Sequence, residues 1–120
     1  MAEPEPLASW GPFHLSRQLY ILVSVDFGPF EWDPKKNLAN RQKHGIDFID
    51  AVAVFNGPAV EGLDERFSYE EPRIIAYGQM GSHVIAVVFC WRKDRRRIIS
   101  ARKATRSETK MYWEIVYGHT

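Results

Sequence analysis

A cluster of arginines and lysines in the second half of the chain has the residue types and spacing for chemistry on a phosphate. Eight basic residues and one acid, Asp94, lie between positions 92 and 106 and give this stretch a net charge of +7. The other residues sum to −6, so a chain with a net charge of only +1 concentrates its positive charge in one segment. Arginine donates two parallel hydrogen bonds to a phosphate and stays charged at any cellular pH. The segment therefore predicts an anionic ligand, either nucleic acid or an acidic protein.

Neither metal nor thiol chemistry is predicted. The histidines, at positions 14, 44, 83 and 119, are scattered and form no ligand-like cluster with the acidic residues. The single cysteine, Cys90, argues against a zinc site and excludes an internal disulfide. We expect Cys90 to be a small buried hydrophobic residue, the chemistry to need no cofactor, and the protein to occupy a reducing, cytoplasmic compartment.

Length and composition predict one soluble domain. The chain has 120 residues, of which 45% are hydrophobic and 26% charged, and no apolar run reaches the roughly 18 residues that a membrane span requires. Residues 1–28 begin with three prolines among small and polar residues, and we expect them to form a loosely ordered extension. The apolar run over 19–25 leaves an added edge strand as the alternative. Residues 29–120 then form the domain.

Capping and helix-breaking residues predict a helical hairpin at the start of this domain. Asp33 is a good N-cap for a helix over 34–44, which begins with a proline, and Gly45 can close it in the left-handed conformation. A second helix begins after Asp47 and carries an apolar stripe at i, i+4 and i+7. Gly57 ends it, because a proline follows.

Short β-type runs and one further helix follow the hairpin. Turn-prone residues separate the runs, so antiparallel strands are expected over 59–64, 73–78, 83–91 and 96–102. The third run is apolar on both faces, which predicts a central strand. Thr105 and Glu108 form a capping box that starts the last helix. The predicted fold is therefore α+β, with an N-terminal helical hairpin, an antiparallel sheet of about four strands and a C-terminal helix.

Four sequence elements, in the order in which they occur along the chain, resemble those of the BrnT-type toxins of bacterial type II toxin–antitoxin pairs. They are FEWDPKKNLANRQKHGIDFIDAVAVF, GLDERFSYEEPRIIAYGQ, VVFCWRKDRRRIISARKATRSE and the closing Tyr112, and the resemblance covers Phe30 to about Tyr117. It implies a RelE-like fold, an endoribonuclease activity and an RNA substrate. It also implies a BrnA-like ribbon-helix-helix antitoxin that neutralises the toxin and binds operator DNA, with two toxins per antitoxin dimer.

The resemblance assigns roles in RNA cleavage by transesterification. This reaction needs the 2′-hydroxyl deprotonated, the charged phosphate stabilised and the leaving 5′-oxygen protonated. We expect Arg73, Arg92 and Arg102, which match arginines of the family motifs, to converge on the phosphate from neighbouring strands. His44 has a suitable pKa for the general base, although its place at a helix end also suits a structural role. Lys43 and Lys103 could donate to the phosphate or protonate the leaving oxygen, and Lys103 is the one assigned to the catalytic set.

A second set of residues is predicted to hold the RNA. Its basic members contact the backbone without reading bases, and Trp91 stacks on a splayed base; the set is Lys43, Arg66, Trp91, Arg95, Arg96, Arg97 and Arg106. The three consecutive arginines could instead dock the antitoxin, and Trp91 could instead be buried. Tyr77, Tyr112 and Trp113 are further stacking candidates. Glu70 and Glu71 could orient Arg73 through an ion pair or form an exposed loop.

Two other functions share this fold and the same residues. The chain could be a non-catalytic module that binds RNA or the antitoxin, or a degenerate toxin that acts only as a transcriptional corepressor. Fold alone does not separate these functions, because they differ only in whether a bond is broken.

Overall fold

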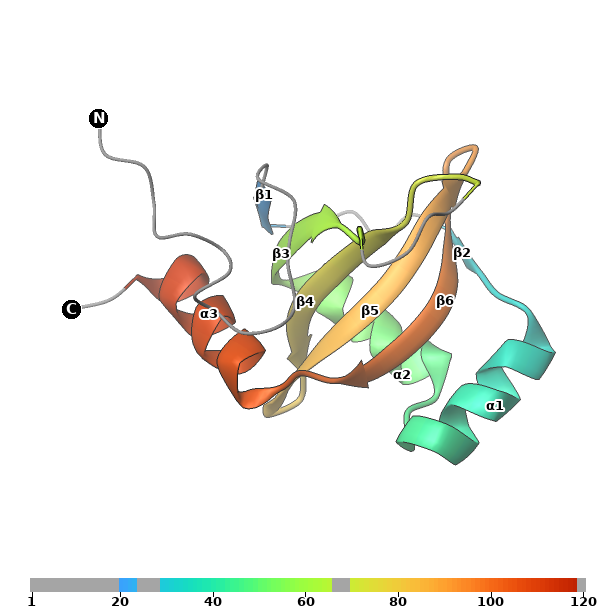
Figure 1. The fold of residues 1–120 in the computed structure, drawn as a ribbon, viewed down its shortest axis with the longest axis horizontal. Coiled ribbons are helices and arrows are strands. Elements are labelled where there is room, and N and C mark those ends of the chain that lie inside the picture. The colour runs from blue at the N-terminus through green and yellow to red at the C-terminus, as the bar shows by residue number, and fades with distance from the viewer. Residues whose placement is uncertain (1–19, 24–28, 66–69, 119–120) are drawn as a thin grey trace.

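The computed structural model describes residues 20–23, for the backbone only, and residues 29–65 and 70–118. Within these ranges a six-stranded sheet has the order β1-β3-β4-β5-β6-β2. The strands are β1 (Tyr20–Val23), β2 (Phe30–Glu31), β3 (Pro58–Leu63), β4 (Ile74–Met80), β5 (His83–Arg92) and β6 (Arg95–Lys103). In Figure 1, α2 lies behind the sheet, α3 at its lower left and α1 beside β6.

The α+β class and the C-terminal helix are confirmed, but the sheet is larger than predicted and is mixed. The four predicted strands correspond to β3, β4, β5 and β6. Strand β1 is the edge strand considered as an alternative for residues 19–25, and it pairs antiparallel with β3. Strand β2 has only two residues and pairs in parallel with β6 at Arg96 and Arg97. A two-residue strand has no alternation of polar and apolar residues that the sequence could reveal.

The capping residues act as predicted. Helix α1 (Pro34–His44) begins where the Asp33 carboxylate accepts a hydrogen bond from the Lys35 amide, and it ends at Gly45 with φ of 74°. The second helix is shorter than expected, because α2 (Phe48–Ala51) gives way to the 3₁₀ helix η2 (Val52–Asn56). Helix α3 (Arg106–Tyr117) carries the complete Thr105–Glu108 capping box.

Both faces of the sheet are covered, with β5 at the centre. The first cluster of buried residues joins α2 and η2 to one face, and Phe48, Phe55 and Phe89 pack within it. The second joins α3 to the other face and includes Tyr77 and Tyr112. Residues of β5 alternate between the two clusters, which explains why its sequence is apolar throughout. The central position predicted for this strand is confirmed.

The buried side chain of Asn40 fastens α1 to the part of the β6 edge that β2 does not cover. The amide of Asn40 donates to the carbonyls of Ile46 and Ala101, each at 2.9 Å, and its oxygen accepts from the Ala101 amide at 3.1 Å. Asn40 thus takes the place of a neighbouring strand for Ala101, since it satisfies both backbone groups of that residue. The result fixes the C-terminal half of α1 beside the last residues of β6.

Candidate active site

The predicted arginines that the structure describes fall into two groups at opposite ends of the β5–β6 hairpin. Arg92 pairs with Arg95 beside the turn, whereas Arg102 pairs with Ala86 near the other end. Arg95 and Arg102 are seven residues apart on one strand, which is about 23 Å at roughly 3.3 Å per residue. Arg73 directly precedes β4, whose first residue pairs with Phe89 near the turn. The three arginines expected to converge on one phosphate are therefore separated, with Arg73 and Arg92 at one end and Arg102 at the other.

Arg102 is held at the junction of β6 and α3 by the carboxylate of Glu108. Its two terminal nitrogens donate to the two carboxylate oxygens at 2.8 and 3.0 Å. The Thr105 amide donates to Oε1 of the same carboxylate at 2.8 Å, and the Tyr77 hydroxyl donates to Oε2 at 2.9 Å. Glu108 is only 3% exposed. Such a bidentate pair fixes the plane of a guanidinium as well as its position.

The protonation states in this network follow from burial and hydrogen bonding. Burial by itself raises the pKa of Glu108, but the hydrogen bonds from Arg102, the Thr105 amide and Tyr77 outweigh it and hold the pKa below its usual value. Burial and the neighbouring Glu108 charge raise the pKa of Tyr77. At neutral pH the carboxyl is therefore ionised and the phenol is protonated, which is the pair of states that the hydrogen bonds require.

His44 lies at the C-terminus of α1, one helical turn after Asn40. Residues four apart share a helix face, so the hydrogen bonds of Asn40 to Ala101 direct this face toward the end of β6. Burial lowers the pKa of His44, and the positive charges of Lys43 and Arg102 lower it further. The imidazole is therefore neutral at pH 7 and lies within electrostatic range of a fixed guanidinium.

The group beside the turn is rich in ion pairs. Arg92 donates to Glu71 at 2.9 Å and Arg97 donates to Glu31 at 2.7 Å. The sequence suggested Arg73 as the partner of the acidic loop, whereas Glu71 pairs with Arg92. The thiol of Cys90, buried as predicted, lies 3.5 Å from the same Glu71 carboxylate.

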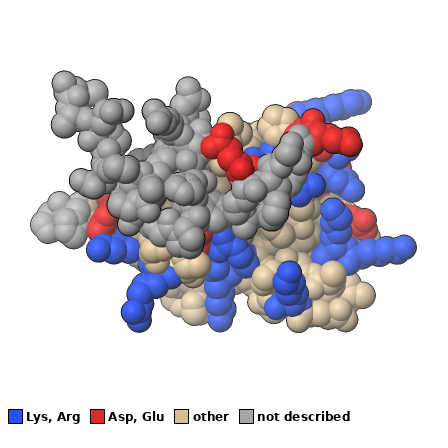
Figure 2. All heavy atoms as spheres, viewed as in Figure 1, with Lys and Arg blue, Asp and Glu red and all other residues tan. Residues whose placement is uncertain are grey.

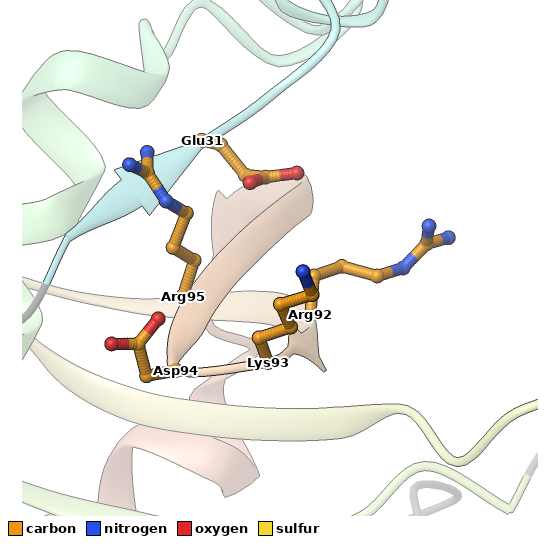
Figure 3. Close-up of a pocket in the computed structure, with 5 residues that line it drawn as sticks. All are labelled: Glu31, Arg92, Lys93, Asp94 and Arg95. Atoms are coloured by element: carbon orange, nitrogen blue, oxygen red, sulfur yellow. The ribbon is translucent and has the colours of Figure 1, made fainter.

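A shallow pocket of about 330 Å³ opens beside this turn. It is lined by Glu31, Arg92, Lys93, Asp94 and Arg95. In Figure 3 the Arg95 guanidinium reaches toward β2, while the Arg92 guanidinium extends away from the other lining residues. The mixed charges around the pocket suit a contact with a charged surface better than they suit the enclosure of a small apolar ligand.

Arg96, predicted to contact RNA, is buried with 6% exposure. Its guanidinium carbon lies 4.5 Å from the centre of the Phe55 ring and 4.6 Å from that of Trp91, and two further phenylalanine rings lie within 6.0 Å. Its charge also lowers the pKa of Glu61, although burial raises this pKa more. These surroundings favour a structural cation–π role for Arg96.

The remaining candidates differ in exposure. Trp91 is 45% exposed and Trp113 is 39% exposed, so both can reach a base, whereas Tyr77 and Tyr112 are fully buried and cannot stack on one. Lys43, Lys103 and Arg106 are exposed, and Arg66 lies outside the described residues. Figure 2 shows the lysines and arginines on the lower and right-hand parts of one face.

Two supporting residues were not identified from the sequence as parts of a site. The contacts of Asn40 with Ala101 and of Glu108 with Arg102 join different elements. Asn40 had one available clue, since a lone asparagine on the packing face of a helix must find hydrogen-bond partners. The sequence identified Glu108 as a helix cap. Its ion pair with Arg102 depends on how the chain turns between β6 and α3, which the sequence does not reveal.

Within the ranges that the structure describes, no group of three or more His, Cys, Asp or Glu residues could hold a metal ion. The same part of the chain contains no helix that is long and apolar enough to cross a membrane. A comparison with family models matches residues 32–108 to BrnT, the ribonuclease toxin of a type II toxin–antitoxin system. The chain belongs to this family. A search of curated proteins finds no match. The part of the chain that matches the BrnT family contains both groups of basic residues.

Proposed function

We propose that this member of the BrnT family is a metal-independent endoribonuclease toxin whose catalytic centre lies at the end of β6 nearest α1 and α3. The observation that carries the proposal is the position of Arg102, whose guanidinium Glu108 holds with two hydrogen bonds at the end of β6. His44 lies on the α1 face that Asn40 fastens to the same end of β6, and the Arg102 charge contributes to lowering its pKa. A general base and a fixed cation are the two parts that phosphate transesterification most needs. The family description supports the activity, and these two residues support the place where it occurs.

In the proposed reaction His44 removes the proton of the 2′-hydroxyl, and the 2′-oxygen attacks the adjacent phosphorus. Arg102 stabilises the negative charge that builds on the phosphate oxygens. The bond from phosphorus to the 5′-oxygen breaks, and Lys103 gives this oxygen a proton. The products are a 2′,3′-cyclic phosphate and a 5′-hydroxyl, and no oxidant, metal or water enters the step.

The exposed side chains of Lys43 and Lys103 make this end of β6 accessible to a single strand of RNA. Successive strand residues point to opposite faces, so Arg102 and Lys103 leave β6 on different sides. Among the described strands, β2 pairs with β6 only at Arg96 and Arg97. Asn40 of α1 covers the same edge at Ala101, and the side chain of Lys103 is exposed just beyond it. A phosphate at this edge can approach side chains from both faces, including that of Lys43 on α1.

The basic group beside the turn takes the role of binding a polyanion away from the reacting bond. Arg92, Arg95 and Arg97 contact the RNA backbone in this proposal, with Arg106 as a further contact at the start of α3. Trp91 stacks on a base, which its exposed position supports. Arg73 joins this group rather than the catalytic centre, because its strand neighbours lie near the turn.

The partner in the proposal is a BrnA-like ribbon-helix-helix antitoxin, with two toxins per antitoxin dimer. Operator DNA is bound through the antitoxin, and the complex acts in the cytoplasm. Membership of a type II toxin–antitoxin family supports a protein antitoxin. The mixed charges around the pocket beside the turn favour a second candidate, a non-catalytic binding module, because they suit contact with a charged surface.

The proposal is tested by incubating the purified chain with a short unstructured RNA in EDTA. We expect cleavage that leaves a 2′,3′-cyclic phosphate, and loss of at least about 100-fold in rate in His44→Ala, as is typical for removal of a general base. Lys36→Ala removes one exposed charge from the same helix and serves as the matched control. Intact RNA with the wild-type chain, despite binding, would favour the non-catalytic module.

A further inference from the structure

The Glu108 carboxylate makes more hydrogen bonds than a helix cap needs. A capping box uses one of its oxygens to accept from the amide of the capping residue, here Thr105 at 2.8 Å. The same carboxylate also accepts two hydrogen bonds from Arg102 and one from the Tyr77 hydroxyl. Three elements, β4, β6 and α3, thus meet at one buried anion. A cap alone explains only one of these four contacts.

We propose that Glu108 is the positioning residue that orients Arg102 toward the scissile phosphate, an inference that rests on the proposed function. Arginine has a long side chain with many rotamers, and fixing it only when RNA binds would cost conformational entropy. The Arg102 side chain is 22% exposed while that of Glu108 is 3% exposed, so the ion pair holds the guanidinium from its inner side. Orientation is therefore set before the substrate arrives.

Tyr77 completes the support from β4, which β5 separates from β6. Its hydroxyl donates to Oε2, the oxygen that also accepts from Nη2 of Arg102. The ring is fully buried between the sheet and α3, so the hydroxyl has little freedom to move. Removal of this hydroxyl leaves the ion pair in place but weakens the restraint on the carboxylate. Tyr77→Phe is therefore the milder of two variants that act on the same support.

The test measures single-turnover RNA cleavage by folded Glu108→Gln and Tyr77→Phe. We expect Glu108→Gln to lower the rate constant about 100-fold, the loss typical of a misplaced catalytic group, with KM changed less than about threefold. Tyr77→Phe should lose about three- to tenfold. Ile115→Ala is the control, because Ile115 packs two turns further along α3 and its loss lowers stability without acting on the carboxylate.

A double-mutant cycle separates positioning from general damage. If Glu108 acts through Arg102, Glu108→Gln slows an Arg102→Ala chain by less than about twofold, because the group to be positioned is already absent. Multiplicative losses, or a loss no greater than that of Ile115→Ala, would overturn the inference.

An NMR measurement of the mobility of the Arg102 guanidinium tests the inference independently of activity. The signals of the Arg102 guanidinium should show a restrained group in the wild type and a rapidly rotating one in Glu108→Gln. A wild-type chain that cleaves no RNA contradicts the proposed function, and the NMR comparison then decides the positioning alone. Rapid rotation already in the wild type would overturn it.

Discussion

Arg102 and Glu108 are joined by two parallel hydrogen bonds across the junction between the last strand and the last helix. The pair lies six residues apart in the sequence, and the turn between them brings the guanidinium back over the start of α3. Because Glu108 also caps this helix, one carboxylate sets both where α3 begins and how Arg102 is oriented. Stability and the candidate catalytic centre therefore depend on the same group.

The first prediction concerns stability in acid. The folded pKa of Glu108 is lowered from 4.5, so the unfolded chain binds this proton more readily than the folded chain. Its contribution is present above about pH 4.5 and is lost as the pH falls through the lower folded pKa. We expect Glu108→Gln to reduce the free energy of unfolding by about 2 kcal/mol at pH 7. Urea denaturation should show this difference shrink as the pH falls below about 4.5, whereas a constant difference would contradict the prediction.

The second prediction compares two adjacent arginines. Arg96 is buried among aromatic rings and Arg95 is exposed, although both were expected to bind RNA. We expect Arg96→Ala to lower the free energy of unfolding by about 3 kcal/mol. The substitution leaves a cavity among the four aromatic rings around the guanidinium and removes the positive charge near Glu61. Arg95→Ala should leave stability within about 0.5 kcal/mol but weaken RNA binding and reduce its salt dependence. Thermal melts and RNA titrations at two salt concentrations measure both effects, and the reverse pattern would refute the assignment.

The third prediction concerns Asn40, which satisfies both backbone groups of Ala101. Asn40→Leu keeps a similar volume but leaves a buried amide and two carbonyls without this partner. We expect a loss of about 3 kcal/mol in the free energy of unfolding, as each buried unsatisfied group costs about 1–3 kcal/mol. Denaturant unfolding measures it. The exposed Asn56, outside the α1–β6 contact, provides the control substitution and should change stability little.

Local features of the fold were predictable because short-range chemistry determines them. Asp33, Gly45 and the Thr105–Glu108 box set helix ends through contacts within a few residues. The central position of β5 followed from its apolar character on both faces. Features that depend on distant segments were not predicted: β2 forms only by pairing with β6, and the aromatic cage of Arg96 is assembled from several elements.

The candidate site was predictable only as a list of residues. The basic segment predicts an anionic ligand, but spacing along the sequence cannot show that a hairpin places Arg92 and Arg102 at opposite ends. The exposure of each basic residue could not be predicted either, because the alternation of residues along β6 gave no reason to expect Arg96 to be buried. The position of His44 beside the end of β6 required the Asn40 contacts with Ala101.

The fourth prediction is a pH profile for RNA cleavage. His44 must be neutral to act as a base, so cleavage should rise with pH through a pKa below the ordinary 6.5. Lys43 contributes to this lowering through its positive charge. We expect Lys43→Ala to move the acid limb toward higher pH by a fraction of a unit, because the charge is exposed and screened. Lys36→Ala should leave the limb unchanged, and an unshifted limb in Lys43→Ala would exclude His44 as the titrating base.

Single-turnover RNA cleavage by Arg102→Ala and Arg92→Ala, compared with the wild type, tests most directly where the catalytic centre lies. Both variants remove one arginine that is paired with a glutamate, so each is the control for the other. We predict that Arg102→Ala loses at least about 100-fold in the rate constant at saturating RNA, whereas Arg92→Ala mainly raises KM. A full rate constant in Arg102→Ala together with a large loss in Arg92→Ala would contradict this account and place the centre beside the β5–β6 turn.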